Sequence, residues 1–85
     1  MIPADQIRRR VAEALPDAVI DLRDTAGDAD HYEMVVVSSA FSGRPTLERH
    51  RMVYAALKDV LGGTLHALAL RTLAPGEPGA DRTTD

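Results

Sequence analysis

The sequence predicts an α+β domain built as a two-layer sandwich, in which helices cover one face of a three-stranded mixed sheet. Two stretches, residues 3–15 and 46–61, carry apolar residues at helical spacing. Three others, residues 18–23, 32–39 and 65–72, alternate polar and apolar residues or are rich in valine, as strands are. The order along the chain is therefore helix, strand, strand, helix, strand.

The two helical stretches have clear boundaries in the sequence. Pro3 suits a first helical position, and Pro16 cannot continue a helix, so the first helix ends before it. The second stretch has an apolar stripe that a charged turn at residues 49–51 interrupts. One long helix and two short ones fit this pattern equally well. Gly62 and Gly63 suit a C-terminal cap.

The connections between the predicted strands determine how the sheet is paired. Three consecutive valines at residues 35–37 predict a middle strand that is buried on both faces or nearly so. The polar segment 24–30 is a loop, so the first two strands pair antiparallel. A helical connection leads to the third strand. If the second and third strands are neighbours, they run parallel with a right-handed crossover.

Length and composition bound the organisation of the chain. Its 85 residues form one domain, predicted at residues 1–75, and residues 76–85 are rich in proline, glycine and charge, so we expect a disordered tail. No apolar run could span a membrane, and arginines stand where a signal peptide needs apolar residues, so we expect a cytoplasmic protein. The net charge of −3 opposes non-specific binding of nucleic acid.

The chain has no cysteine and three histidines. The first fact excludes disulfides, a thiol nucleophile and an iron–sulfur cluster held by thiolates of this chain alone. The best metal ligands available are His31, His50 and His66, but their spacing matches no zinc motif, and each alone is more often a structural or surface residue. The acidic segment 24–33 lacks EF-hand spacing. No catalytic dyad is evident, so we expect no enzyme.

The second helical stretch is locally basic, and two interpretations of it stay open. The residues concerned are Arg44, Arg49, Arg51 and Lys58. They form either a solvated helix face whose charge acidic neighbours partly offset, or a patch that contacts phosphates, because the arginine guanidinium presents a planar fork to phosphate oxygens.

Three linked motifs resemble those of the BolA family. They are GDADHYEMVVVS at residues 27–38, FSG at 41–43 followed by RHRMVYAAL at 49–57, and HALALRT at 66–72. The resemblance runs in order from about Ile7 to Pro75. It implies the family's α-β-β-α-α-β fold, related to the type II KH domain, and therefore favours two helices within residues 44–61. The G-x-x-G loop of nucleic-acid-binding KH domains is absent.

The resemblance implies a non-enzymatic partner of a monothiol glutaredoxin, with a shared 2Fe–2S cluster, acting in iron–sulfur maturation, trafficking or iron sensing. The family's third-strand histidine corresponds to His66, and its ligand from the loop before the second strand corresponds to His31. The glutaredoxin and glutathione would each supply a thiolate. Parallel neighbouring strands would bring both histidines to the same end of the sheet. We expect no cofactor in the isolated chain, and a monomer or weak homodimer.

Two alternatives remain within the resemblance. One is a DNA-binding, stress-responsive transcriptional regulator of the morphogen type that uses the four basic residues named above. The other is an interaction module that binds the glutaredoxin without metal. We expect a structural role near a helix start for His50, and structural roles for Gly43 and Tyr54 of the family motifs.

Overall fold

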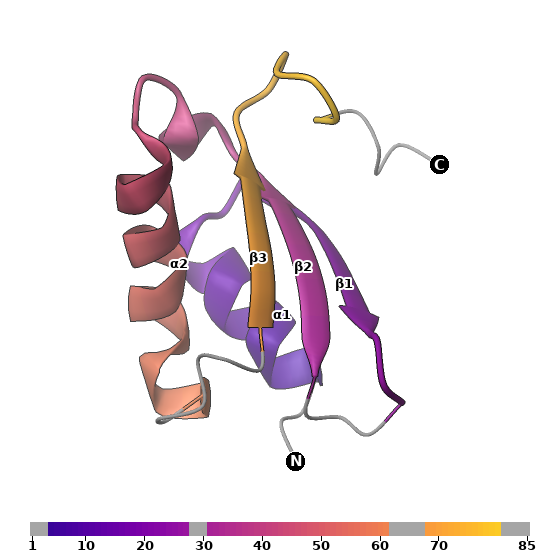
Figure 1. Cartoon of the computed structure of the whole chain (residues 1–85). Coiled ribbons are helices and arrows are strands. Elements are labelled where there is room, and N and C mark those ends of the chain that lie inside the picture. The colour runs from indigo at the N-terminus through magenta and orange to yellow at the C-terminus, as the bar shows by residue number, and fades with distance from the viewer. Residues whose placement is uncertain (1–3, 28–30, 62–67, 81–85) are drawn as a thin grey trace.

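The computed structural model describes residues 4–27, 31–61 and 68–80 (Figure 1). Its elements in chain order are helix α1 (Ala4–Ala14), strands β1 (Val19–Asp24) and β2 (Tyr32–Val37), the 3₁₀ helix η1 (Ser39–Phe41), helix α2 (Thr46–Leu61) and strand β3 (Leu68–Leu73). The glycine cap and the start of the third strand were predicted within residues 62–67, which lie outside the described residues.

The three strands form one sheet in the order β1-β2-β3. The central strand β2 pairs antiparallel with β1 and parallel with β3. Both α-helices lie against the same face of this sheet (Figure 1). The predicted two-layer α+β sandwich with a mixed sheet is confirmed, and so are the antiparallel hairpin and the parallel neighbours β2 and β3.

One hydrophobic core joins the helices to the sheet. Because side chains alternate across a strand, Tyr32, Met34 and Val36 of β2 face the helices, while Val35 and Val37 face away from them. This explains why three consecutive valines are all buried. The main core consists of Ile7, Val11, Leu15, Leu22, Tyr32, Met34, Val36, Phe41, Val53, Leu57, Leu68 and Ala74.

The helical segment between β2 and β3 corrects one expectation. Two helices were expected within residues 44–61, but α2 is a single α-helix over Thr46–Leu61, and the additional helical turn is η1, which precedes that stretch. The charged turn at 49–51 does not break α2, because its buried member, Arg49, is ion-paired inside the protein.

Asp17, in the turn before β1, fixes the start of η1. Its Oδ1 accepts a hydrogen bond from the Ser38 hydroxyl at 2.6 Å, and its Oδ2 accepts bonds from the Ser39 amide at 2.8 Å and the Ser39 hydroxyl at 2.5 Å. The Ser38 oxygen also accepts the Ala40 amide, as an N-cap does. Three donors favour the charged carboxylate, and they lower the pKa of Asp17 to about 2.

The C-terminal segment covers part of the sheet face opposite the helices. Ala80 packs against a small cluster of Val35, Val37 and Leu73 on that face. Residues 75–80 form turns, in which Gly76 and Gly79 have φ values of 89° and 91° that glycine adopts without steric cost. The expected disorder from residue 76 therefore does not describe residues 76–80. Residues 81–85 lie outside the described part.

Arg49 connects α2 to β3 and to the turns at residues 75–80. Only 9% of the residue is exposed. Its guanidinium forms a two-pronged ion pair with Glu77, with Nη1–Oε1 at 2.7 Å and Nη2–Oε2 at 2.9 Å. Nε donates to the Arg44 carbonyl at 2.8 Å, and Nη1 also donates to the Thr72 carbonyl at 3.3 Å. The guanidinium carbon lies 6.0 Å from the centre of the Phe41 ring. A buried charge is tolerated when it is paired and hydrogen-bonded in this way.

The ion pair holds both partners in their charged forms. The hydrogen bonds from Arg49, and then that from the Ala74 amide at 2.8 Å, lower the pKa of Glu77 to about 2. The same contact with Glu77 raises the pKa of Arg49. The Glu77 carboxylate thus fixes the segment after β3 to the fold, together with the packing of Ala80.

We predict that Glu77→Ala lowers the melting temperature by several degrees, because it leaves the Arg49 charge buried without its carboxylate. Glu48→Ala is the matched control. Glu48 pairs with Arg44 at 3.4 Å, but both side chains are about half exposed, and such pairs contribute little. Thermal unfolding followed by circular dichroism should show a several-fold larger decrease for Glu77→Ala. Equal, small decreases would contradict the structural role of the buried pair.

We also predict acid sensitivity from the two carboxylates whose pKa values folding lowers to about 2, from ordinary values of 3.8 for Asp17 and 4.5 for Glu77. Such a group contributes stability that is fully present above its unfolded pKa and is lost as the pH falls towards its folded pKa. Urea unfolding should therefore show a declining free energy of unfolding between about pH 4.5 and about pH 2. Glu77→Gln and Asp17→Asn should each make this decline shallower, and an unchanged profile in both variants would refute the assignment.

Candidate functional site

The predicted ligand His31 lies directly before β2, at the N-terminal end of that strand. Its backbone carbonyl accepts hydrogen bonds from the Thr25 amide at 3.0 Å and the Thr25 hydroxyl at 3.2 Å. These bonds continue the β1–β2 ladder by one residue and fix the backbone at His31. The residue is exposed. An exposed histidine is thus held at a defined position at one end of the sheet.

On the side away from β1, the neighbour of β2 is β3. The two strands run parallel, with Tyr32 opposite Leu68. Neighbouring strands lie about 4.8 Å apart, so the described N-terminal ends of β2 and β3 are adjacent. The second predicted ligand, His66, precedes Leu68 by two positions in the sequence and lies outside the described residues.

The third histidine, His50, lies at the other end of the molecule. It belongs to the first turns of α2, beside Arg49, whose guanidinium reaches the carbonyl of Thr72 near the C-terminal end of β3. Its ring meets the Tyr54 ring edge-on, with centroids 6.2 Å apart and an angle of 87° between the planes. His50 is half-buried, and this packing agrees with a structural role.

The four basic residues of the predicted phosphate-contacting patch do not share one environment. Arg51 and Lys58 are exposed, and Arg44 is exposed with its guanidinium held by the Ala40 carbonyl at 3.1 Å and by Glu48. Arg49 is buried, and its fork is occupied by a carboxylate. Arg49 is therefore removed from the set of residues that could contact a phosphate.

The two remaining residues of the family motifs have structural surroundings. Gly43 has a φ of 76° in the turn between η1 and α2, a left-handed conformation that favours glycine. At this turn the Arg44 amide donates to the Phe41 carbonyl at 3.1 Å. Tyr54 is half-buried and packs against the main core. Both observations agree with the predicted structural roles.

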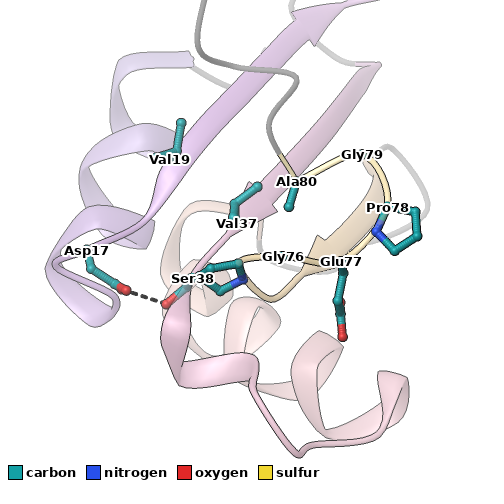
Figure 2. A pocket seen from close by; sticks show the side chains of 10 residues that line it. Asp17, Val19, Val37, Ser38, Gly76, Glu77, Pro78, Gly79 and Ala80 are labelled. Atoms are coloured by element: carbon teal, nitrogen blue, oxygen red, sulfur yellow. Dashed lines mark hydrogen bonds between the residues drawn. The ribbon is translucent and has the colours of Figure 1, made fainter.

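An open groove of about 530 Å³ lies between the C-terminal end of β2 and the turns at 75–80. Figure 2 shows Val19 and Val37 at this groove, with the hydrogen bond between Asp17 and Ser38 at its rim. Its two carboxylates, Asp17 and Glu77, are both engaged in the internal contacts described above. The groove therefore presents apolar surface. It lies at the opposite end of β2 from His31.

Sequence reasoning missed Asp17 and Glu77, which organise the C-terminal end of the sheet. The separations in the chain, 21 residues from Asp17 to Ser38 and 28 from Arg49 to Glu77, leave no local signal for either contact. Over the residues that the structure covers, no group of three or more histidines and carboxylates could hold a metal ion. Neither described α-helix is long and apolar enough to cross a membrane.

The known-protein comparisons agree with this architecture. Residues 7–77 match the family model described as BolA-like protein. This chain belongs to the BolA family. BolA-like protein 1 of Homo sapiens is 41% identical to it over 78 residues, which cover 84% of this chain and 57% of the human protein. The DNA-binding transcriptional regulator BolA of Escherichia coli (strain K12) is 49% identical over 47 residues, covering 55% of this chain and 45% of that protein.

The solved structures place the fold in the same family. BolA1 from Arabidopsis thaliana superposes with a TM-score of 0.76 at 31% identity, covering 87% of this chain and 93% of that one. This BolA-like chain spans less than two thirds of the curated BolA-like protein 1 relatives, 57% in the human case. The BolA-like fold with its two α-helices and mixed sheet is thus shared with structures of similar length.

Proposed function

We propose that this BolA-like protein is a non-enzymatic partner of a monothiol glutaredoxin and contributes His31 and His66 to a 2Fe–2S cluster that the two proteins share. The observation that carries the proposal is the parallel register of β2 and β3. His31 stands one position before Tyr32 in the sequence, His66 stands two positions before Leu68, and Tyr32 and Leu68 are direct partners in the sheet.

The donor set of the chain fits half of such a cluster. Imidazole is a good ligand for iron, and the chain has no cysteine, so the thiolates would come from the glutaredoxin and from glutathione. Bound iron–sulfur clusters supply one-electron redox chemistry, and imidazole in place of thiolate on one iron raises the reduction potential. The proposed role of this chain is to provide two imidazoles, of which that of His31 belongs to the residue directly before β2.

The surroundings of His31 suit a ligand for a shared site. The residue is exposed, so a partner protein can approach it, and Thr25 restrains its backbone through two hydrogen bonds to the His31 carbonyl. A restrained backbone reduces the conformational entropy that is lost when the side chain binds a metal. Because β2 and β3 are parallel neighbours that start at the same end of the sheet, a second ligand can come from the β3 side.

We predict that an anaerobic mixture of this protein with a monothiol glutaredoxin, glutathione, iron and sulfide forms a 1:1 complex with a Rieske-like visible spectrum. His31→Ala and His66→Ala should each abolish or alter this spectrum, because each removes one imidazole from the iron. Visible absorption and circular dichroism of the purified complexes measure the effect.

His50→Ala is the matched control, since it removes the same imidazole from α2 at the opposite end of the sheet and should leave the cluster spectrum unchanged. Spectra that stay the same in both His31→Ala and His66→Ala would refute the ligand assignment. A stable complex with glutaredoxin that forms without iron, and whose affinity neither substitution changes, would instead support the metal-free interaction module.

A second candidate function is DNA-binding transcriptional regulation. The name of the Escherichia coli relative favours it, and so do the exposed basic residues Arg44, Arg51 and Lys58. Arg51 and Lys58 are seven positions apart on α2, so they lie close to one side of the helix. The buried ion pair of Arg49 and the net charge of −3 weigh against it.

If DNA binding is the function, Arg51→Ala and Lys58→Ala should each weaken binding to duplex DNA and reduce the salt slope of log K by about one. Fluorescence anisotropy at several salt concentrations measures both quantities. The matched control, Arg10→Ala on α1, should have no effect. No binding at low salt would eliminate this second candidate.

A further inference from the structure

The strand β1 forms one edge of the sheet, with β2 as its neighbour, and no described strand lies beyond it (Figure 1). Its six residues are VIDLRD, and three of them carry charges of both signs: Asp21, Arg23 and Asp24. Edge strands usually discourage pairing with other chains by carrying charge. Charges of both signs on an edge can instead favour pairing of two copies, if opposite charges face one another across a twofold axis.

The direction of the backbone groups along this edge follows from two contacts. The Thr25 amide donates to the His31 carbonyl, so Thr25 turns its backbone groups towards the β2 side. In an antiparallel pair this direction alternates from residue to residue. Ile20, Leu22 and Asp24 therefore turn their backbone groups outward, and the Arg8 guanidinium indeed reaches the Leu22 carbonyl from α1, at 3.5 Å.

The side chains of the intervening residues lie on the sheet face opposite the helices. Asp21 stands opposite Val35 and Arg23 opposite Glu33 in the β1–β2 register. The valine belongs to the small cluster on that face. Within one chain Asp21 and Arg23 form an ion pair at 3.5 Å, in which the Arg23 side chain is 62% exposed.

One twofold arrangement of two β1 strands satisfies both the backbone and the charges. If the strands pair antiparallel about Leu22, the outward-turned residues meet one another, with Leu22 opposite Leu22 and Ile20 opposite Asp24. Asp21 of one copy then stands opposite Arg23 of the other. Because a twofold contact occurs twice, two reciprocal ion pairs form. They occupy non-hydrogen-bonded positions, where facing side chains are closest.

Other registers do not give this match. An axis at Ile20 or at Asp24 keeps the backbone groups facing one another but overlaps fewer residues of β1, and it does not bring Asp21 opposite Arg23. The Leu22-centred register also places Val19 opposite Thr25 of the second copy. Val19 is 44% exposed, and part of its apolar surface would be buried there.

We propose that the outer edge of β1 is a self-association surface, through which a second copy of this chain adds antiparallel about Leu22 to make a continuous six-stranded sheet. The Arg8 bond to the Leu22 carbonyl is at the long limit for a hydrogen bond, and the Arg8 side chain is about half exposed. A backbone amide of the second copy can therefore displace it. The surface is separate from the adjacent ends of β2 and β3, so it does not depend on the function proposed above.

The test is a charge exchange between two variants of the full chain, followed by sedimentation velocity at concentrations up to about 1 mM. Wild type should show reversible dimerisation. Asp21→Arg places arginine opposite arginine, and Arg23→Asp places aspartate opposite aspartate. Each variant alone should therefore dimerise about tenfold more weakly or worse. An equimolar mixture of the two should dimerise like wild type, because both facing pairs become opposite in charge again.

The matched control is Arg71→Asp, which makes the same charge change on the other edge strand, β3, on the same face of the sheet. It should leave dimerisation unchanged. Restoration in the mixture shows that the single variants are folded, since misfolded chains would not pair. A wild type that stays monomeric throughout, or a mixture that associates no better than its two components, overturns the proposal.

Discussion

The buried guanidinium of Arg49 is the constraint on which the C-terminal half of the structure depends. A charge that is 9% exposed needs a counter-charge and hydrogen-bond acceptors within reach, and Glu77, the Arg44 carbonyl and the Thr72 carbonyl supply them. Meeting these needs fixes the start of α2 against the end of β3. It also positions the turns at 75–80, whose Ala80 then covers the apolar cluster on the second face of the sheet.

The two ends of the sheet consequently have different properties. At the C-terminal end of β2 and β3, the carboxylates of Asp17 and Glu77 are both saturated with internal donors and have pKa values of about 2. Polar groups used in this way stabilise the fold and are poorly suited to binding a partner. At the N-terminal end, His31 is exposed, and Thr25 restrains its backbone. The proposed ligand chemistry belongs to the end where an accessible side chain stands on a fixed backbone.

Local sequence signals predicted the elements well, and long-range contacts explain what they missed. Pro16 marked the end of the first helix, and the valines at 35–37 marked the central strand, because both signals act within a few residues. The same reasoning assigned Arg49 to a basic surface, since its pairing with Glu77 spans 28 residues. It assigned Glu77 to a disordered tail for the same reason. The parallel direction of β2 and β3 was predictable on the condition that they are neighbours, since a helix connects them, and the structure shows that they are neighbours.

In the proposed complex, two imidazoles of this chain bind one iron of a cluster shared with a glutaredoxin. The most direct test of this assignment is pulsed electron paramagnetic resonance of the reduced complex, formed once with unlabelled chain and once with chain carrying ¹⁵N-histidine, while the glutaredoxin and glutathione stay unlabelled. We expect couplings from two nitrogens that change from ¹⁴N to ¹⁵N with the label. A spectrum of the cluster that the label leaves unchanged would contradict it.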